Sequence, residues 1–128
     1  GLDEVFQAVS NEADQEARAR IRETVKIARR HRVLLVSHRA GQALVAEDSK
    51  DTALNQLFDE ANRDDRMREA YVKFFQMWRE EGGSLVMHTA DCSPLRSDGR
   101  WGALEHQSQD SHSAPKHQGL MEYGLFGR

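Results

Sequence analysis

Two short apolar runs joined by a long helical stretch constrain the fold of this chain most. Residues 33–36 form a continuous branched run, Val-Leu-Leu-Val, which is typical of a strand buried on both faces of a parallel sheet. We therefore predict a central strand over residues 33–38 and a second strand over residues 84–89, after a helix stop at Gly82 and Gly83. Strand, helix and strand in this order indicate a right-handed parallel crossover. The predicted fold class is α/β, with the two strands adjacent or one apart in one sheet and their carboxyl ends on the same side.

Helical spacing of apolar residues accounts for most of the remaining chain. It predicts an amphipathic helix over residues 14–32, two helices over residues 52–58 and 67–78, and a last helix that Pro115 opens and that runs through Tyr123. A break is expected near Asn62, where Asp64 or Asp65 can cap the following helix.

Four aromatic side chains form a stripe within the predicted helix 67–78, namely Tyr71, Phe74, Phe75 and Trp78. Leaving several large aromatic rings in water is unfavourable. We therefore expect this stripe to bury against the sheet or against a partner chain.

Size and charge fit a single domain over residues 1–128. The net charge of −3 comes from 18 basic and 21 acidic residues mixed along the chain, so no global field favours nucleic acid. The basic residues within 14–32 are interrupted by Glu16 and Glu23 and have no interleaved aromatics, as expected of a solvated helix face. No apolar run reaches the roughly 20 residues of a membrane span, and no signal peptide is recognised, so localisation stays open. Cys92 is alone, which excludes an internal disulfide.

Ordered short motifs between residues 33 and 123 resemble the C-terminal stretch of bacterial glycoside-hydrolase-like TIM-barrel proteins, some of them described as cellulose-binding. The motifs that carry the resemblance are Gly41-Gln42 with Leu44, Leu57-Phe58, Ala61-Asn62-Arg63-Asp64, Arg66-Met67, Tyr71, Trp78-Arg79, Gly82-Gly83, His88, Trp101-Gly102-Ala103-Leu104-Glu105 and Pro115-Lys116.

This resemblance implies that the two strands belong to the last βα units of a (β/α)8 barrel, with ligands at their carboxyl ends. In the family, the loop after the first of these strands carries a glutamate before Gly-Gly-Gln, whereas the matching position here is Arg39. A guanidinium cannot act as a glycosidase nucleophile, so hydrolysis is not expected. A whole barrel needs about 250 residues. The chain therefore packs into a smaller sheet, or assembles with copies of itself or with another chain.

His38 and His88 are expected to lie together at the carboxyl ends of the predicted strands. Such a pair could bind a sugar hydroxyl, move a proton or hold a metal, or each imidazole could simply bond to loop backbone. Asp91 and Cys92 would complete a four-ligand metal set, but no tight ligand spacing supports one. We therefore assign neither a metal nor another cofactor.

Two residues after the second strand are further candidates for ligand contact. Trp101 could form a platform for a sugar ring, or it could plug the end of the core. Glu105 is the only carboxylate of its motif, and a structural hydrogen bond is favoured over a catalytic role.

These observations favour a carbohydrate-related, glycoside-hydrolase-like barrel segment that is not catalytic as it stands. Its predicted binding residues are His38, Arg39, His88, Asp91, Trp101 and Glu105, and its expected ligand is an oligosaccharide. The alternative is a structural or interaction subunit, which forms a homo-oligomer or joins a larger protein assembly. A phosphate or nucleotide binder ranks last, because the sequence has no glycine-rich phosphate loop.

Overall fold

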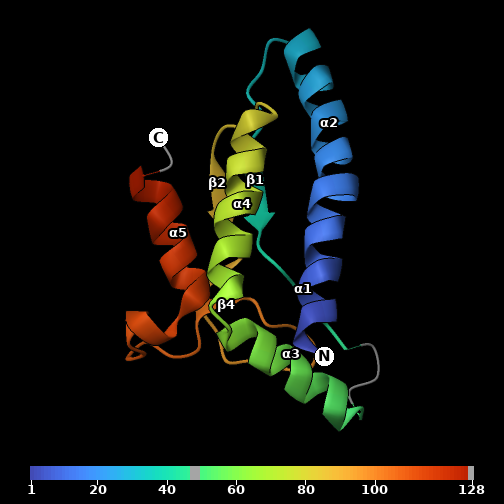
Figure 1. Ribbon diagram of the computed structural model, residues 1–128. Coiled ribbons are helices and arrows are strands. Elements are labelled where there is room, and N and C mark those ends of the chain that lie inside the picture. The colour runs from blue at the N-terminus through green and yellow to red at the C-terminus, as the bar shows by residue number, and fades with distance from the viewer. Residues whose placement is uncertain (47–49, 127–128) are drawn as a thin grey trace.

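The structure is a computed structural model that describes residues 1–46 and 50–126 and has a mixed α/β architecture (Figure 1). Its elements in chain order are α1 (Leu2–Asn11), the π-helix η1 (Glu12–Ala17), α2 (Arg18–Arg30), β1 (Ser37–Ala40), α3 (Thr52–Arg63), α4 (Arg66–Glu80), β2 (Val86–His88), β3 (Ala90–Cys92), β4 (Gly102–Leu104), the 3-10 helix η2 (Ser111–Ser113) and α5 (Pro115–Phe126). No described helix combines the length and apolarity that crossing a membrane requires.

The first helix is longer than the sequence indicated. The prediction of residues 14–32 was wrong at its start, because α1, η1 and α2 follow one another without a break from Leu2 to Arg30. Val5 is buried and Phe6 packs against the core, so the early turns also have an apolar face. At the far end, hydrogen bonds from Arg22 and Arg18 lower the pKa of Glu81 to about 2 and tie α2 to the end of α4.

The predicted parallel pairing of the two strands is confirmed. Strands β1 and β2 are parallel neighbours, with Ser37 opposite Val86 and Ala40 opposite His88. Backbone bonds on both sides extend the pairing, from Ser84 N to Leu35 O at 2.8 Å and from Thr89 N to Ala40 O at 2.9 Å. Their carboxyl ends therefore lie side by side.

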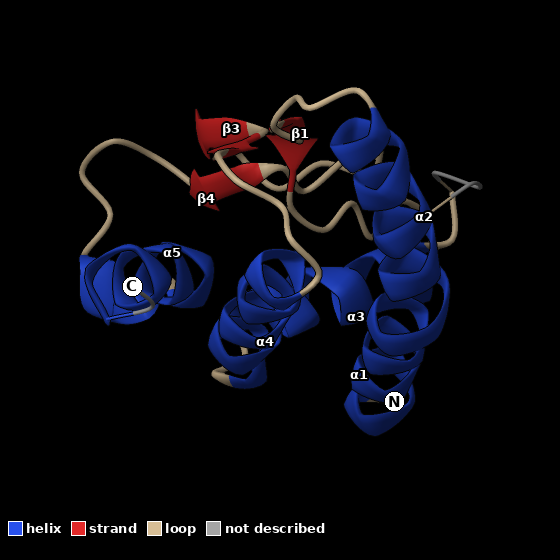
Figure 2. Ribbon diagram, turned by 90° about the horizontal axis from the view of Figure 1, so that it is seen from above, coloured by secondary structure: helices blue, strands red, loops and turns tan. Residues whose placement is uncertain are grey.

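The predicted burial of the first strand is wrong. Val33, Leu34 and Val36 are 59%, 78% and 48% exposed, and strand β1 itself begins only at Ser37. The cause is the width of the sheet: within the described residues β1 has β2 as its one neighbour. Helices α4 and α5 lie on one side of the strands (Figure 2), and in the part of the chain that the structure describes no helix covers the opposite, open face of this sheet.

A second parallel pair joins β3 to β4, with Ala90 opposite Gly102 and Cys92 opposite Leu104. The sequence analysis predicted neither of these strands, and Asp91 lies in β3. Each strand has only three residues, which is too short for an alternating pattern to stand out.

Helix α4 carries the core, as the aromatic stripe predicted. Tyr71, Phe75 and Trp78 are buried, and Phe74 is half-buried. Met67, Tyr71 and Phe75 form a cluster to which the other elements add Phe6, Ala40, Leu44, Val86, Leu120 and Tyr123. The break between α3 and α4 falls at Asp64, whose carboxylate accepts from Arg66 N at 2.9 Å.

Candidate functional site

The six predicted site residues differ in exposure. His38 and Arg39 are exposed on β1 and Asp91 is exposed on β3, whereas His88, Trp101 and Glu105 are half-buried. Among the described residues no cluster of three or more His, Cys, Asp or Glu side chains is arranged to hold a metal ion. The structure therefore does not assemble the set of two histidines, Asp91 and Cys92.

His88 faces the core, and both of its ring nitrogens are engaged. Nδ1 lies 2.9 Å from Ala90 O, and Nε2 lies 3.1 Å from Tyr71 Oη. Because a carbonyl only accepts, Nδ1 carries the proton and Nε2 accepts from the tyrosine hydroxyl. Tyr71 Oη in turn accepts from Gln42 N at 3.4 Å. His38 is not a partner of this imidazole within the described chain, so the two histidines do not act as a bonded pair.

The interior position of these groups favours their neutral forms. Burial lowers the pKa of His88 and raises the pKa of Tyr71 well above its usual value. Gly41 makes the contact between them sterically feasible: its φ is +126°, and a Cβ there would lie 2.8 Å from His88 Nε2 and 3.1 Å from Tyr71 Oη.

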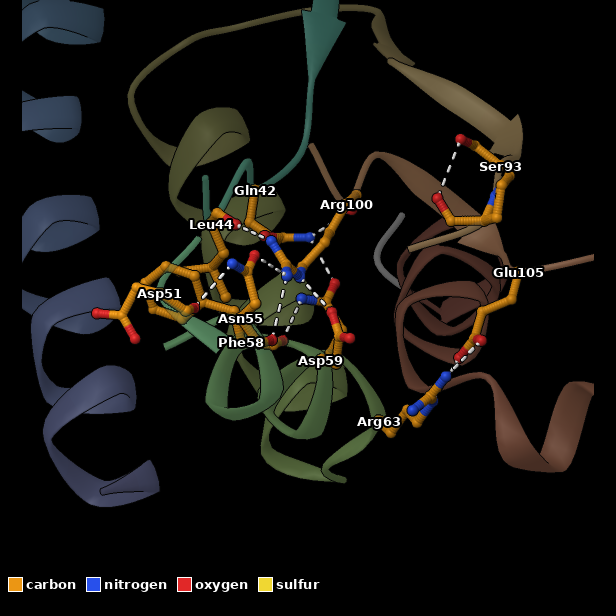
Figure 3. Close-up of polar contacts among 12 residues, drawn as sticks. Gln42, Leu44, Asp51, Asn55, Phe58, Asp59, Arg63, Ser93, Arg100 and Glu105 are labelled. Carbon is orange, nitrogen blue, oxygen red and sulfur yellow. Dashed lines mark hydrogen bonds and ion pairs between the residues drawn. The ribbon is translucent and has the colours of Figure 1, made fainter. Parts of the chain in front are cut away.

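Below the ends of β1 and β2, a buried arginine that the sequence did not single out organises the polar contacts (Figure 3). Arg100 is 1% exposed. Its Nε donates to Asp59 Oδ1 at 2.6 Å and its Nη1 donates to Leu44 O at 2.8 Å. Its Nη2 donates to Asn55 O at 3.1 Å and to Asn55 Oδ1 at 2.9 Å. One guanidinium thus joins helix α3, the loop after β1 and the segment before β4.

The backbone carbonyl of Arg100 accepts further hydrogen bonds from side chains of other segments. It accepts from Gln42 Nε2 at 2.7 Å and from Lys116 Nζ at 2.8 Å. Gln42 Nε2 also donates to Asn62 Oδ1 at 2.7 Å, and Asn62 Nδ2 donates to Phe58 O at 2.8 Å. Burial lowers the pKa of Lys116 to about 8. Among the described groups, Gln42 Oε1 is buried without a hydrogen-bond partner.

Glu105 and Trp101 have separate environments. Arg63 donates to both carboxylate oxygens of Glu105, at 2.7 and 2.8 Å, and this lowers the pKa of the carboxyl group. The indole of Trp101 lies over Gly99, where an added Cβ would come within 1.8 Å of Nε1. Trp101 remains half-buried, so it is neither enclosed in the core nor fully exposed.

A cavity of about 270 Å³ lies between η1, α4 and the turn at Gly41 and Gln42. Apart from Glu12, Gln42 and Tyr71, side chains without polar groups line it. Sugars need several polar contacts, so the strand ends suit them better than this cavity does.

Arg100 and Asp59 were missed by the sequence analysis. The motifs that resemble glycoside-hydrolase-like barrels include Gln42, Asn62 and Lys116, but the sequence analysis predicted no contact for these three residues. One feature of the sequence indicated that Arg100 could be buried: it lies between Gly99 and the apolar segment that begins at Trp101. A charged residue in such a position is rarely buried unless it is paired.

Comparisons of this chain with models of protein families, with curated proteins and with solved structures find no match. The likeness to glycoside-hydrolase-like barrels therefore stays a prediction. The functional argument depends on the contacts described above.

Proposed function

We propose that this chain is a carbohydrate-binding, non-catalytic segment of a glycoside-hydrolase-like (β/α)8 barrel. The observation that carries the proposal is the convergence of the motif residues. Gln42 and Lys116 both donate to the carbonyl of Arg100, and Gln42 also donates to Asn62. Through Tyr71, Gln42 is linked to His88. Residues far apart in the sequence thus hold the two strand ends and their loops in one arrangement.

This arrangement suits a rigid binding face. Carboxyl ends of parallel strands are the usual location of ligand sites in α/β barrels, and a binding site needs support from fixed neighbouring groups. His38, Arg39 and Asp91 are exposed near these ends, and half-buried Trp101 follows the bonded Arg100. Hydrogen-bonding groups beside an aromatic face are what a sugar ring requires.

The carboxylates near the site do not suit hydrolysis. Glycosidases need one carboxylic acid and one carboxylate at suitable spacing. Glu105 is held ionised by Arg63, and Asp59 is bonded to Arg100. Asp91 is the remaining candidate among the site residues, and one carboxylate is insufficient.

We expect weak oligosaccharide binding without turnover. Tryptophan emission should change on titration with a panel of neutral and acidic oligosaccharides, and Trp101→Phe should abolish the change. Trp78 is the internal control, because it is 6% exposed and its Nε1 donates to Ser84 O. Chromogenic glycosides should not be cleaved.

Two results would contradict the proposal. Failure of every saccharide in the panel to bind would remove the binding function. Turnover that disappears in Asp91→Asn or Glu105→Gln would reveal a working carboxylate and remove the non-catalytic assignment.

A second candidate, a structural or interaction subunit, is favoured by the open face of the β1–β2 sheet. In addition to the exposed residues before β1, Leu85 and Met87 are 59% and 45% exposed. Contiguous exposed apolar surface is typical of protein interfaces.

For this candidate, mass measurement in solution should give a particle heavier than the 14.6 kDa of one chain. The double variant Leu34→Ser, Leu85→Ser should shift it toward the monomer mass, whereas Met121→Ser, at a 48% exposed position on α5, should not. A wild-type monomer at all concentrations tested would argue against assembly through copies of this chain.

A further inference from the structure

Positive charge gathers at the carboxyl ends of β1 and β2, although the whole chain has a net charge of −3. Arg39 is exposed at the end of β1, and no ion pair joins it to a carboxylate among the residues that the structure describes. Lys116 lies beneath the strand ends. Its pKa of about 8 leaves it largely protonated at pH 7. Its Nζ donates to Arg100 O at 2.8 Å, and the same carbonyl accepts from Gln42 Nε2, so the ammonium group lies at the loop that follows β1.

The carboxylates around these cations are mostly neutralised by other arginines. Asp59 is paired with Arg100 at 2.6 Å, and Glu105 is paired with Arg63 at 2.7 Å. Neither Asp91 nor Arg39 has an ion-pair partner among the described residues. Glu105 acts on Lys116 as well, so Arg39 is the exposed cation of the predicted site that no described carboxylate neutralises.

We propose that the carbohydrate site prefers saccharides that bear carboxylates, and that Arg39 determines this preference. The inference depends on the proposed function, because it specifies the ligand class of the same site. A guanidinium donates two parallel N–H groups to one carboxylate, which gives orientation as well as attraction. The pairing of β1 with β2 fixes the backbone that carries Arg39. A hexuronic acid offers a ring for Trp101 and a carboxylate for Arg39.

The test compares trigalacturonic acid with its fully methyl-esterified form, which has the same rings and no charge. We expect the acid to bind at least about tenfold more tightly in low salt, and added salt to reduce the difference. Arg39→Gln should abolish the difference, because it weakens binding of the acid far more than binding of the ester. Arg39→Lys should keep part of the preference for the acid, because lysine retains the positive charge but lacks the planar guanidinium that binds a carboxylate through two parallel hydrogen bonds.

Arg30→Gln serves as the matched control, since Arg30 is an exposed arginine on α2. It should leave the preference unchanged, and circular dichroism should verify that each variant is folded. Equal affinity for acid and ester, or a preference that survives Arg39→Gln, would overturn the inference while the proposed function stands. Absence of binding to acidic and neutral saccharides alike would overturn both.

Discussion

Replacing Arg100 with methionine is expected to lower the free energy of unfolding by about 3–5 kcal/mol. The guanidinium is 1% exposed, and its donors satisfy Asp59, Leu44 and Asn55. Methionine fills similar space but donates no hydrogen bond. Carbonyl groups inside the protein and a partly buried carboxylate would therefore lose their partners, which costs more than the pair itself contributes. Urea unfolding monitored by circular dichroism measures the loss.

Arg96→Met is the matched control for this experiment. Arg96 lies four positions earlier, and its ion pair with Asp98 joins side chains that are 66% and 72% exposed. Exposed pairs contribute little, so we expect a change within about 0.5 kcal/mol. A similar small change for Arg100→Met would contradict the role assigned to the buried guanidinium.

Phe75→Ala should also destabilise the protein, by about 3–5 kcal/mol. The ring is 1% exposed and contacts Tyr71 and Phe74 edge to face, with centroids 5.8 and 5.5 Å apart. It also approaches Tyr123 of α5 at 5.3 Å. Removing it leaves a cavity where α4 meets α5, and the cost follows from lost burial and from the empty volume.

The adjacent exposed residue provides the comparison for Phe75. Gln76→Ala changes the same helix without touching the core, so the free energy of unfolding should shift by less than about 0.5 kcal/mol. A loss of that small size for Phe75→Ala would place Phe75 outside the core.

The helices were predictable where their signal is local. Helix α3 begins at Thr52 as expected, α4 begins one residue before the predicted Met67, and α5 begins at Pro115. In each case apolar spacing within a few turns, with a capping or opening residue, carries the information. The strands were harder, because their burial depends on how many neighbours the sheet has. The apolar run at residues 33–36 predicted a central strand, but the described sheet has only two strands.

The candidate site was less predictable than the fold. The sequence indicated His88 as a site residue, but its inward orientation depends on Tyr71 and on a glycine whose φ is positive. The burial of Arg100 depends on three segments that meet only in the folded chain. No local pattern distinguishes such an arginine from an exposed one, since the difference lies in partners distant along the sequence.

That distance also bears on how the chain reaches its fold. Arg100 finds its partners 56 residues away at Leu44 and 45 residues away at Asn55, and its carbonyl meets Gln42 across 58 residues. Closing such long loops costs entropy before any of these bonds can form. Helices with local contacts can form early, whereas the charge of Arg100 stays hydrated until the chain segments around it have come together. We therefore expect the network at the strand ends to form late in folding, after the helical part of the chain is in place.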